Sequence, residues 1–597
     1  MTDAEATYCD GVYRDGDVRI MDRSGDRRLP IGDDGFESLA PRSVFVDKSM
    51  LAADLLGSDY KVTLFCRPRR FGKTLAMTML KSFFELPPDG VSRAPLFEGL
   101  AVWDAKGGRY RAEQGVRPVI YLSLNDVKKG SWEECYQTLE GKMAAEYQRH
   151  AYLADSAALS EDERLQFGRV SGKEGEYDDV ASSLRQLTLY LFKHHGRRVV
   201  ILIDEYDAPI MAAYNRGYYR QAVDFVKGWL TGALKDGGSA LDFACLTGVQ
   251  RIAKEPIFSD LNNLTVDTAL DTESDERFGF TSLEVASLAS YLGHPHKREE
   301  LREWYDGYRF GDADIYNPWS VLNYFSKHCR PGVYWANTAS NAVVGDAVRS
   351  ADGEGLRDVY QLLQPGGVVW RPLDMSVVFP ESGLTGDALW SMLYLAGYLT
   401  TEDTEDPNDQ YLLRRLRVPN KEIARVFSGE VVERFRSEAG GTERLRQLHL
   451  SLVAGNAAAV ETGLSRILMT SPSCRDLTSE NSYHMLLVGL LFGVPGYGVP
   501  LSNREEGRGY YDLRLAPEKR CGRPLREDLP VITVEFKALS SHDAPSDPEG
   551  LAQALAELAA LGVEQIDRKG YDCEEGAGCL RYGIAFCGKN VAVACER

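Results

Sequence analysis

The sequence predicts an α/β protein with a parallel sheet covered by helices on both faces, then a helical region, then a second α/β domain. Three observations support this prediction. From Leu29 to about Phe280, short apolar runs alternate with helical stretches, which is the pattern of a parallel sheet between helices. Beyond Thr281 the sequence becomes helical and rich in aromatic residues. Residues 471–597 return to a mixture of strand and helix patterns.

A chain of 597 residues exceeds what one hydrophobic core usually supports, so several domains are expected. The clearest loop is the acidic stretch 400–410, which contains Asp406-Pro407-Asn408. Two helical segments follow it between about Lys421 and Met469. We therefore expect four parts, which comprise residues 1–280, 281–420, 421–470 and 471–597.

The composition excludes several classes of protein. A net charge of −19 argues against broad electrostatic adhesion to nucleic acid, although it leaves room for a local basic groove. The eleven cysteines are scattered singly, without a C-x-x-C pair or a zinc-ligand spacing. The sequence contains no signal peptide and no long apolar span. We therefore expect a cytoplasmic protein with reduced thiols and no membrane partner.

The strands of the first part are expected at residues 61–66, 118–124, 199–203 and 243–247. The first of them leads into Gly72-Lys73-Thr74 and then into a helical stretch. In such a strand–loop–helix unit, backbone N–H groups and the positive end of the helix face the phosphates of a nucleoside triphosphate. Gly72 keeps this approach free of a Cβ, Lys73 reaches the β and γ oxygens, and the Thr74 hydroxyl can ligate Mg²⁺.

One position departs from the usual G-x-x-x-x-G-K-[ST] pattern, because Arg67 replaces the first glycine. Without that glycine the loop cannot wrap the phosphates in the same way. Arg69 and Arg70 could supply the charge that backbone amides otherwise provide, which makes Arg70 a candidate nucleotide-binding residue. The alternative is that these arginines pair with acidic neighbours at the surface.

A second segment, Val199–Ile203 followed by Asp204 and Glu205, points to the same chemistry. Five consecutive aliphatic residues fit a strand that is buried on both faces of a parallel sheet. Asp204 would lie where a nucleotide-bound Mg²⁺ needs an outer carboxylate, and Glu205 could orient or deprotonate the attacking water. The alternative is a core strand that merely meets solvent. Downstream of a Gly-Lys-Thr loop, the binding of ATP and Mg²⁺ is favoured.

Two further residues follow from the strand at 243–247. Thr247 ends it, where a hydroxyl could sense the γ-phosphate. Arg251 comes four residues later and could stabilise charge on the transferring group. A structural role in the turn is an equal alternative for both.

Another candidate site involves the segment Val531–Ala538, which alternates with period two. Its apolar residues face a core, so Glu535 and Lys537 share the other face. The segment around Asp512 alternates likewise, and pairing of the two strands brings Asp512 close to Glu535 and Lys537. Two carboxylates and a lysine at one point can bind Mg²⁺ or Mn²⁺ and position water for attack on a phosphodiester. The alternative is an ordinary ion pair on an exposed strand.

Several motifs in the first two parts resemble the bacterial AAA-ATPase-like family, a P-loop group usually fused to a nuclease-like C-terminal domain. In chain order they are Leu29–Gly32, Val46–Ser49, Arg67–Thr74, Ile203–Pro209, Leu246–Lys254, Tyr305–Phe310, Tyr316–Ser320, Asn337-Thr338 and Ser340-Asn341. In that family the loop begins with arginine. The resemblance therefore implies that Arg67 is a family feature.

The last part resembles the PD-(D/E)xK nuclease superfamily, in the branch usually fused to this ATPase. Asp512 matches the aspartate and Glu535-Phe536-Lys537 matches the E-x-K element, with Tyr511 in place of the usual proline. The flanking segments 480–490, 502–505 and 583–589 fit the same branch.

The resemblance also implies two residues outside these strands. Glu480 could be the extra acidic residue that this fold often supplies from its first helix. Gln565 lies in the helix that commonly follows the E-x-K strand, and Gln553 is a rival for the same place. His484 shares a helix face with Glu480, and we interpret it as a histidine at the edge of the core.

The expected function is ATP binding and hydrolysis that gates a metal-dependent nuclease, with Asp512, Glu535, Lys537, Glu480 and Glu205 as catalytic residues. The alternative is a nucleotide-switched binding or signalling protein whose nuclease-like part only recognises its target. A phosphotransferase acting on a small molecule would leave the C-terminal residues unexplained. The expected partners are ATP and nucleic acid, either DNA or RNA, and self-association into a homo-oligomer stays open.

Overall fold

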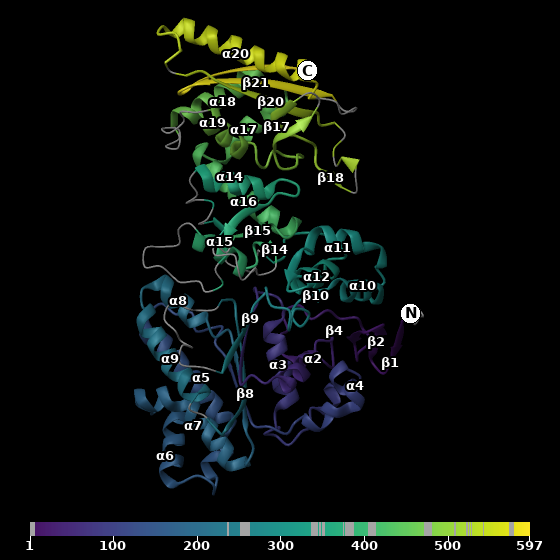
Figure 1. The fold of residues 1–597 in the computed structure, drawn as a ribbon, viewed down its shortest axis with the longest axis vertical. Helices are drawn as coiled ribbons and strands as arrows, with labels where there is room; N and C mark the ends of the chain where they lie inside the picture. The colour runs from purple at the N-terminus through teal and green to yellow at the C-terminus, as the bar shows by residue number, and fades with distance from the viewer. Residues whose placement is uncertain are drawn as a thin grey trace. The chain divides into compact units, whose positions relative to one another are not determined.

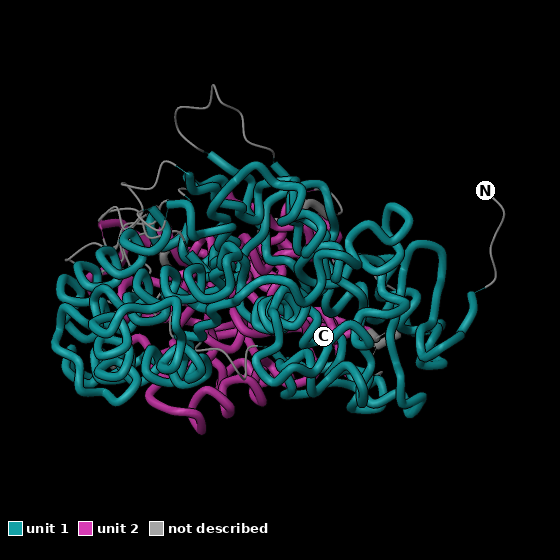
Figure 2. The backbone as a smooth tube through the Cα atoms, turned by 90° about the horizontal axis from the view of Figure 1, so that it is seen from below, with its two compact units in different colours: residues 1–339, 370–422 teal, residues 340–369, 423–597 magenta. Residues whose placement is uncertain are grey.

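The computed structural model describes residues 6–235, 238–250, 263–335, 344–345, 348, 353–373, 375, 387–403, 413–470, 480–506, 509–520, 523–524, 526, 528–540, 542–571 and 578–597. The chain forms two compact units, which Figure 2 draws in different colours. Unit 1 comprises residues 1–339 and 370–422, and unit 2 comprises residues 340–369 and 423–597. The two units cut across the predicted part 281–420, because residues 340–369 belong to unit 2, and the division into four parts stays a prediction.

The core of unit 1 is a parallel sheet with the strand order β6-β7-β8-β5-β9 (Figure 1). Its strands are β5 (Val62–Cys66), β6 (Val119–Ser123), β7 (Val199–Asp204), β8 (Leu241–Gly248) and β9 (Leu264–Asp267). The first four lie where the apolar runs predict them, and every residue of β7 is buried. The sequence did not predict β9, because a run of Leu-Thr-Val-Asp is short and half polar.

Helices cover both faces of this sheet, as the alternating pattern predicts. Figure 1 shows α5, α7 and α9 on one side of β8 and α2, α3 and α4 on the other. The bounds of the helices of this part are α2 (Met50–Gly57), α3 (Lys73–Phe84), α4 (Ala101–Gly108), α5 (Trp132–Arg149), α6 (Glu161–Gly172), α7 (Tyr177–His195), α8 (Ala208–Arg216) and α9 (Tyr219–Leu234). Apolar side chains from α5, α6, α7 and α9 join those of the sheet in one buried cluster, which holds the strands in place.

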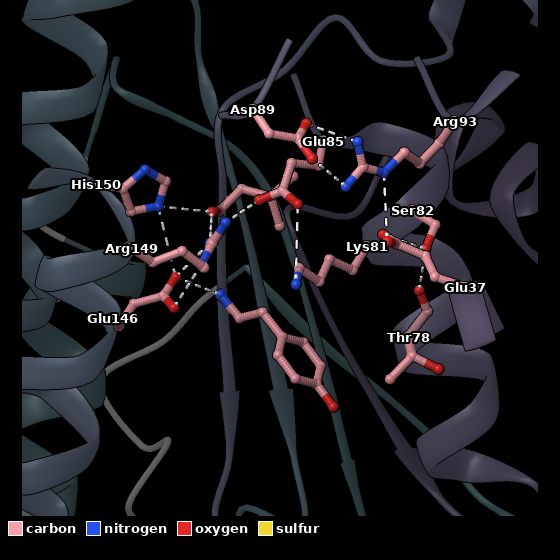
Figure 3. A network of polar contacts seen from close by, with 12 residues as sticks. Glu37, Thr78, Lys81, Ser82, Glu85, Asp89, Arg93, Glu146, Arg149 and His150 are labelled. Atoms are coloured by element: carbon pink, nitrogen blue, oxygen red, sulfur yellow. Dashed lines mark hydrogen bonds and ion pairs between the residues drawn. The ribbon is translucent and has the colours of Figure 1, made fainter. Parts of the chain in front are cut away.

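A polar network fastens the C-terminal end of α3 to the sheet (Figure 3). Arg149 ends α5 and pairs with Glu85, which follows α3, and with Glu146. Its Nη2 also donates to the carbonyl of Val119 at the start of β6. Burial alone would raise the pKa of Glu146, but hydrogen bonds from His150 and Arg149 lower it to about 2. The end of α3 remote from the loop 67–72 is therefore fixed.

An antiparallel sheet of order β1-β2-β3-β4 precedes these elements. Its strands are β1 (Thr7–Cys9), β2 (Val12–Asp15), β3 (Val18–Met21) and β4 (Phe45–Val46), and the short helix α1 (Phe36–Leu39) lies between the last two in the chain. Ile20 and Val46 join the buried cluster that also contains residues of the following helical region.

Residues 280–326 are largely helical, as predicted, but they also contain a small sheet of order β10-β12-β11. The elements are β10 (Phe280–Thr281), α10 (Ser282–Tyr291), α11 (Arg298–Tyr305), β11 (Tyr308–Phe310), β12 (Ala313–Tyr316) and α12 (Pro318–Ser326). The aromatic motif at 304–310 therefore does not continue as a helix. Gly307 turns the chain with φ 98°, a left-handed value that favours glycine, and Tyr308–Phe310 form a strand.

Unit 1 is completed by α15 (Asp387–Leu395) and by β14 (Thr400–Thr401) and β15 (Leu413–Arg417), which pair antiparallel. The strand β13 (Val369–Pro372) extends this sheet in the order β13-β15-β14. The acidic loop predicted at 400–410 lies mostly outside the described residues.

Unit 2 contains a mixed sheet of order β16-β17-β20-β21-β22. Its elements are α14 (Gly353–Leu363), α16 (Lys421–Glu438), α17 (Thr442–Val453), α18 (Ala457–Thr470), α19 (Glu480–Leu490), β16 (Leu501–Glu506), β17 (Gly509–Leu515), β18 (Lys519–Arg520), β19 (Arg523–Pro524), β20 (Val531–Ala538), α20 (Pro548–Lys569), β21 (Cys579–Cys587) and β22 (Asn590–Glu596). The stretch 421–470, predicted as two helices, is divided further, because Gly440 and Gly441 separate α16 from α17 and Gly455 separates α17 from α18.

Strands β17 and β20 pair antiparallel, as the sequence predicts. Strands β20 and β21, which α20 connects in the chain, pair in parallel. The helix α20 comes unusually close to this sheet. A Cβ on Gly583 of β21 would lie 1.8 Å from the carbonyl oxygen of Ala559, and one on Gly562 would lie 3.0 Å from the Cα of Gly583. This close approach lets α20 cover the face of β20 that carries Glu535.

Within the described residues, the helices are all too short or too polar to cross a membrane.

Candidate functional site

The loop between β5 and α3 leads directly into the N-terminus of α3. Arg70 and Gly72 both have left-handed backbone angles, with φ 70° and 85°, and Gly72 lies directly before the first helical residue, Lys73. Lys73 Nζ donates to the carbonyls of Arg67 and Pro68, each at 2.8 Å. Burial lowers the pKa of Lys73. The lysine is thus folded back over the loop, close to where phosphates would bind.

A chain of short hydrogen bonds joins the loop to the ends of two strands. Thr74 Oγ1 donates to Asp204 Oδ2 at 2.7 Å, and Thr247 Oγ1 donates to Asp204 Oδ1 at 2.6 Å. Asp204 is fully buried, and burial raises its pKa. The predicted residues of the loop, β7 and β8 are therefore brought together, and both oxygens of Asp204 are held in fixed directions.

Glu205 follows Asp204 with φ 53°, a strained angle for a side chain larger than glycine. Its Oε2 lies 3.2 Å from Lys128 Nζ, and both side chains are partly exposed. Such strain persists only where the surroundings impose it. The surroundings of the turn after β7 therefore hold the backbone of Glu205 in this conformation.

Arg67 has a role that the sequence did not predict. It is fully buried, and its Nη2 lies 2.6 Å from Asp267 Oδ1 at the end of β9. Its Nη1 donates to the carbonyls of Cys66 and Asp267, and its guanidinium lies between the rings of Phe278 and Phe310. The sequence suggests pairing with acidic residues only for Arg69 and Arg70, so this buried ion pair of Arg67 is a new finding of the structure. No local pattern reveals a partner that lies two hundred residues away.

The aromatic motif around Tyr308 and Phe310 supports the same loop. The ring of Phe71 contacts Tyr308 and Phe310 at centroid distances of 4.9 and 5.1 Å. The carbonyl of Phe71 accepts a hydrogen bond from Gly279 N at 3.1 Å. The loop is therefore shaped by the small sheet that follows it in the chain, and not by a glycine at position 67.

A pocket of about 440 Å³ lies over the start of α3, within the size range of small-molecule sites. Its wall includes Arg70, Gly72, Lys73, Thr74 and Glu205, all of which the sequence predicts as functional. Asp204 and Thr247 are buried beside it through the hydrogen bonds with Thr74. Arg251 lies outside the described residues.

Arg69 and Arg70 also line this pocket and are exposed. Among the described residues, neither guanidinium forms an ion pair, and that of Arg70 stacks on the ring of Trp319 at 4.4 Å. The alternative of surface pairing with acidic neighbours is therefore not what these two side chains do. They leave positive charge at the wall of the pocket.

The C-terminal candidates also come together. Glu535 is fully buried, and its Oε2 accepts from Gln565 Nε2 at 2.9 Å and lies 3.6 Å from Lys537 Nζ. Asp512 Oδ2 accepts from Phe536 N at 2.7 Å. Burial, together with the nearby Asp512 carboxylate, raises the pKa of Glu535 well above its ordinary value. Glu535 Oε1 is buried and accepts no hydrogen bond from the described residues.

The remaining C-terminal candidates are placed in part. Gln553 bonds to Glu557 on its own helix and is exposed, so Gln565 is the glutamine at this site. His484 is buried, bonds to Ser502 Oγ at 2.8 Å and has a pKa lowered by burial, in keeping with the edge of a core. The side chain of Glu480 lies outside what is described. No set of three or more His, Cys, Asp or Glu side chains within the described residues could hold a metal ion.

One comparison with known protein families concerns the first half of the chain. A family model described as a predicted AAA-ATPase matches residues 30–258, which include the loop, β7 and β8. This match confirms the AAA-ATPase-like part of the resemblance. It ends before the C-terminal unit, so the nuclease-like assignment stays a prediction.

Two individual proteins are also similar. A protein of Azotobacter chroococcum mcd 1, described as an uncharacterized protein in the vnfD 5' region, is 26% identical over 452 residues, which cover 75% of this chain and 78% of that protein. The Walker-type ATPase PABY2304 of Pyrococcus abyssi has a TM-score of 0.36 and 13% identity, over 67% of this chain and 98% of its own. The latter similarity is too low to bear on the assignment.

Proposed function

We propose that the protein binds and hydrolyses ATP at the loop 67–74, and that the nucleotide controls a metal-dependent nuclease in its C-terminal part. One observation carries the first half of this proposal. A lysine-bearing loop and a pocket of suitable size adjoin the hydrogen-bonded set Thr74, Asp204 and Thr247. A threonine hydroxyl and an aspartate in contact, next to the loop lysine, are the groups that position a nucleotide and its metal ion.

Three residues of this site would have distinct roles in the binding and hydrolysis of ATP. Lys73 would turn from the carbonyls of Arg67 and Pro68 to the β and γ oxygens, which offer it a stronger, charge-assisted hydrogen bond. Arg70, whose guanidinium lies over the ring of Trp319 and lines the pocket, would add charge at the phosphates. Glu205 would accept the proton of the attacking water.

Mg²⁺ at this site would be held by Thr74 and Asp204. When bound, it supplies positive charge that neutralises the phosphate oxygens. The fit rests on the fixed directions of both Asp204 oxygens and on the buried position of this carboxylate, whose pKa is raised by burial. A neighbouring cation would favour its ionised form. Thr247 would keep Asp204 oriented through its hydrogen bond. In this way it would link Asp204 to the predicted sensing of the γ-phosphate.

The second half of the proposal rests on Asp512, Glu535 and Lys537. Glu535 Oε1 is a buried acceptor without a donor among the described residues, and its carboxylate faces that of Asp512. Buried polar atoms usually have a bonding partner, and a divalent cation held by both carboxylates would be such a partner for Glu535 Oε1. A bound Mg²⁺ or Mn²⁺ would act there as a Lewis acid toward a phosphodiester. Lys537 would hold the water or offset charge in the transition state, and Gln565 would keep Glu535 in place.

The alternative, a nucleotide switch without cleavage, is favoured by a different observation. One oxygen of Asp512 already accepts from the amide of Phe536, and no cluster of three acidic or histidine side chains is formed by the described residues. A site of this kind could recognise nucleic acid without cutting it. The two functions predict different results in one assay.

Purified protein would be incubated with labelled single- and double-stranded DNA and RNA, with Mg²⁺ or Mn²⁺, with and without ATP, while phosphate release is measured in the same tubes. We expect metal-dependent cleavage of at least one substrate that falls by about a hundredfold or more in Lys537→Ala, as losing a group that stabilises the transition state commonly does. Gln565→Ala should reduce cleavage, whereas the matched variant Gln553→Ala should not. Phosphate release without cleavage under any condition would support the switch instead.

A further inference from the structure

Glu422 is a buried carboxylate that the chemistry above does not use. It lies in the first turn of α16 and is 1% exposed. Its Oε1 accepts from the backbone amides of Tyr334 and Trp335 at 2.5 and 2.6 Å, and its Oε2 accepts from Ser320 Oγ at 2.7 Å. No lysine or arginine among the described residues pairs with it. Burial raises its pKa to about 7.

A carboxylate kept in such a place usually has a specific task, because burying it without a cation is costly. The contacts made by the residues that Glu422 binds indicate what this task is. The indole Nε1 of Trp335 donates to the carbonyl of Arg69 at 3.0 Å. The Trp335 ring is buried and packs against Tyr398 at a centroid distance of 4.8 Å. Glu422 therefore fixes the backbone from which one indole reaches the loop.

A second connection runs through Trp319. Its neighbour Ser320 bonds to Glu422, its Nε1 donates to the carbonyl of Tyr334 at 3.2 Å, and its ring carries the guanidinium of Arg70. Two consecutive loop residues, Arg69 and Arg70, are thus held by two tryptophans that both depend on one carboxylate.

We propose that Glu422 is a positioning residue of the nucleotide site, which sets the conformation of the loop through Trp335 and Trp319. This inference rests on the proposed binding of ATP at the loop. The groups that touch the loop are the tryptophans, and Glu422 acts only through them. The two backbone amides need an acceptor more than they need a charge, so glutamine at position 422 preserves the arrangement and alanine does not.

The test compares the affinity for MgATP and the kcat and KM for ATP hydrolysis in the full chain. Trp335→Phe keeps most of the packing and removes the indole N–H, so we expect ATP affinity to fall roughly tenfold, the size of one lost hydrogen bond. Glu422→Ala should lose at least as much, and Glu422→Gln should stay within about twofold of the wild type. The matched control is Trp229→Phe, another fully buried tryptophan that gives up one indole hydrogen bond, to Ser183 Oγ, in the core of the same unit.

The double variant Trp335→Phe/Glu422→Ala separates positioning from general damage. If Glu422 acts through Trp335, the double variant loses as much ATP affinity as Glu422→Ala alone. If the two residues act independently, the fold-losses in affinity of the single variants multiply. If Glu422→Ala does not fold, the ATP affinities of Trp335→Phe and Trp229→Phe still test the proposal. ATP binding by the wild type with unchanged affinity in Trp335→Phe overturns this inference alone. Absence of ATP binding by the wild type overturns the proposed function and this inference with it.

Discussion

Replacing Arg67 with glycine, which would restore the usual first glycine of the loop, is expected to destabilise unit 1 by about 3–5 kcal/mol. Arg67 is fully buried and bonded to Asp267, whose pKa is raised by burial despite this partner. Removing the guanidinium leaves a buried carboxylate without its cation and a cavity between Phe278 and Phe310. Calorimetric unfolding of the full chain, without nucleotide, measures the change.

The control lies in the same loop. Arg69→Gly removes an exposed guanidinium that pairs with no described residue, so it should change the stability by no more than about 1 kcal/mol. The double variant Arg67→Gly/Asp267→Asn should recover part of the loss, since it also removes the stranded charge. Equal stability of Arg67→Gly and the wild type would mean that the buried ion pair does not hold the loop.

Glu205→Gln is expected to lower the rate of ATP hydrolysis by about 10²–10⁴-fold while ATP remains bound. Glutamine keeps the size of the side chain at the wall of the pocket but cannot accept the proton of the attacking water. Glu205 lines the pocket, whereas the neighbouring carboxylates Asp204 and Asp207 are buried. Single-turnover phosphate release, together with equilibrium binding of ATP, gives both quantities.

Glu133→Gln, at the exposed start of α5, is the control and should leave both quantities unchanged. Hydrolysis by Glu205→Gln at the wild-type rate would remove Glu205 from the mechanism. Loss of ATP binding in the same variant would instead indicate that Glu205 holds the nucleotide.

The parallel sheet could be predicted because its strands are apolar on both faces. Every residue of the runs at 62–66 and 199–203 is buried and most of them are apolar, as is typical of parallel strands between helices. The strand β9 escaped prediction, since Leu264–Asp267 is short and becomes a strand only through pairing with β5. Propensity read from one segment does not include such pairing.

Of the two sites, the sequence predicts only the features that depend on residues close together in the chain. Period-two alternation correctly brings Asp512 to the strand that carries Glu535. It gives the face of a strand but not what covers that face, so the burial of Glu535 beneath α20 had to come from the structure. The pairing of Arg67 with Asp267 and the path from Glu422 to the loop connect residues far apart in the sequence. No motif contains both ends of such contacts.

The central claim is that the loop 67–74 binds ATP although arginine replaces its first glycine. Equilibrium titration of MgATP into the wild type, Lys73→Ala and Lys81→Ala tests it most directly. Lys81 lies at the other end of α3, beside Glu85, and serves as the control. We expect saturable binding by the wild type and Lys81→Ala and a loss of about a hundredfold or more in affinity for Lys73→Ala, which would lack its charge-assisted bonds to the phosphates. Equal affinity of all three proteins, or no binding by the wild type, would contradict the claim.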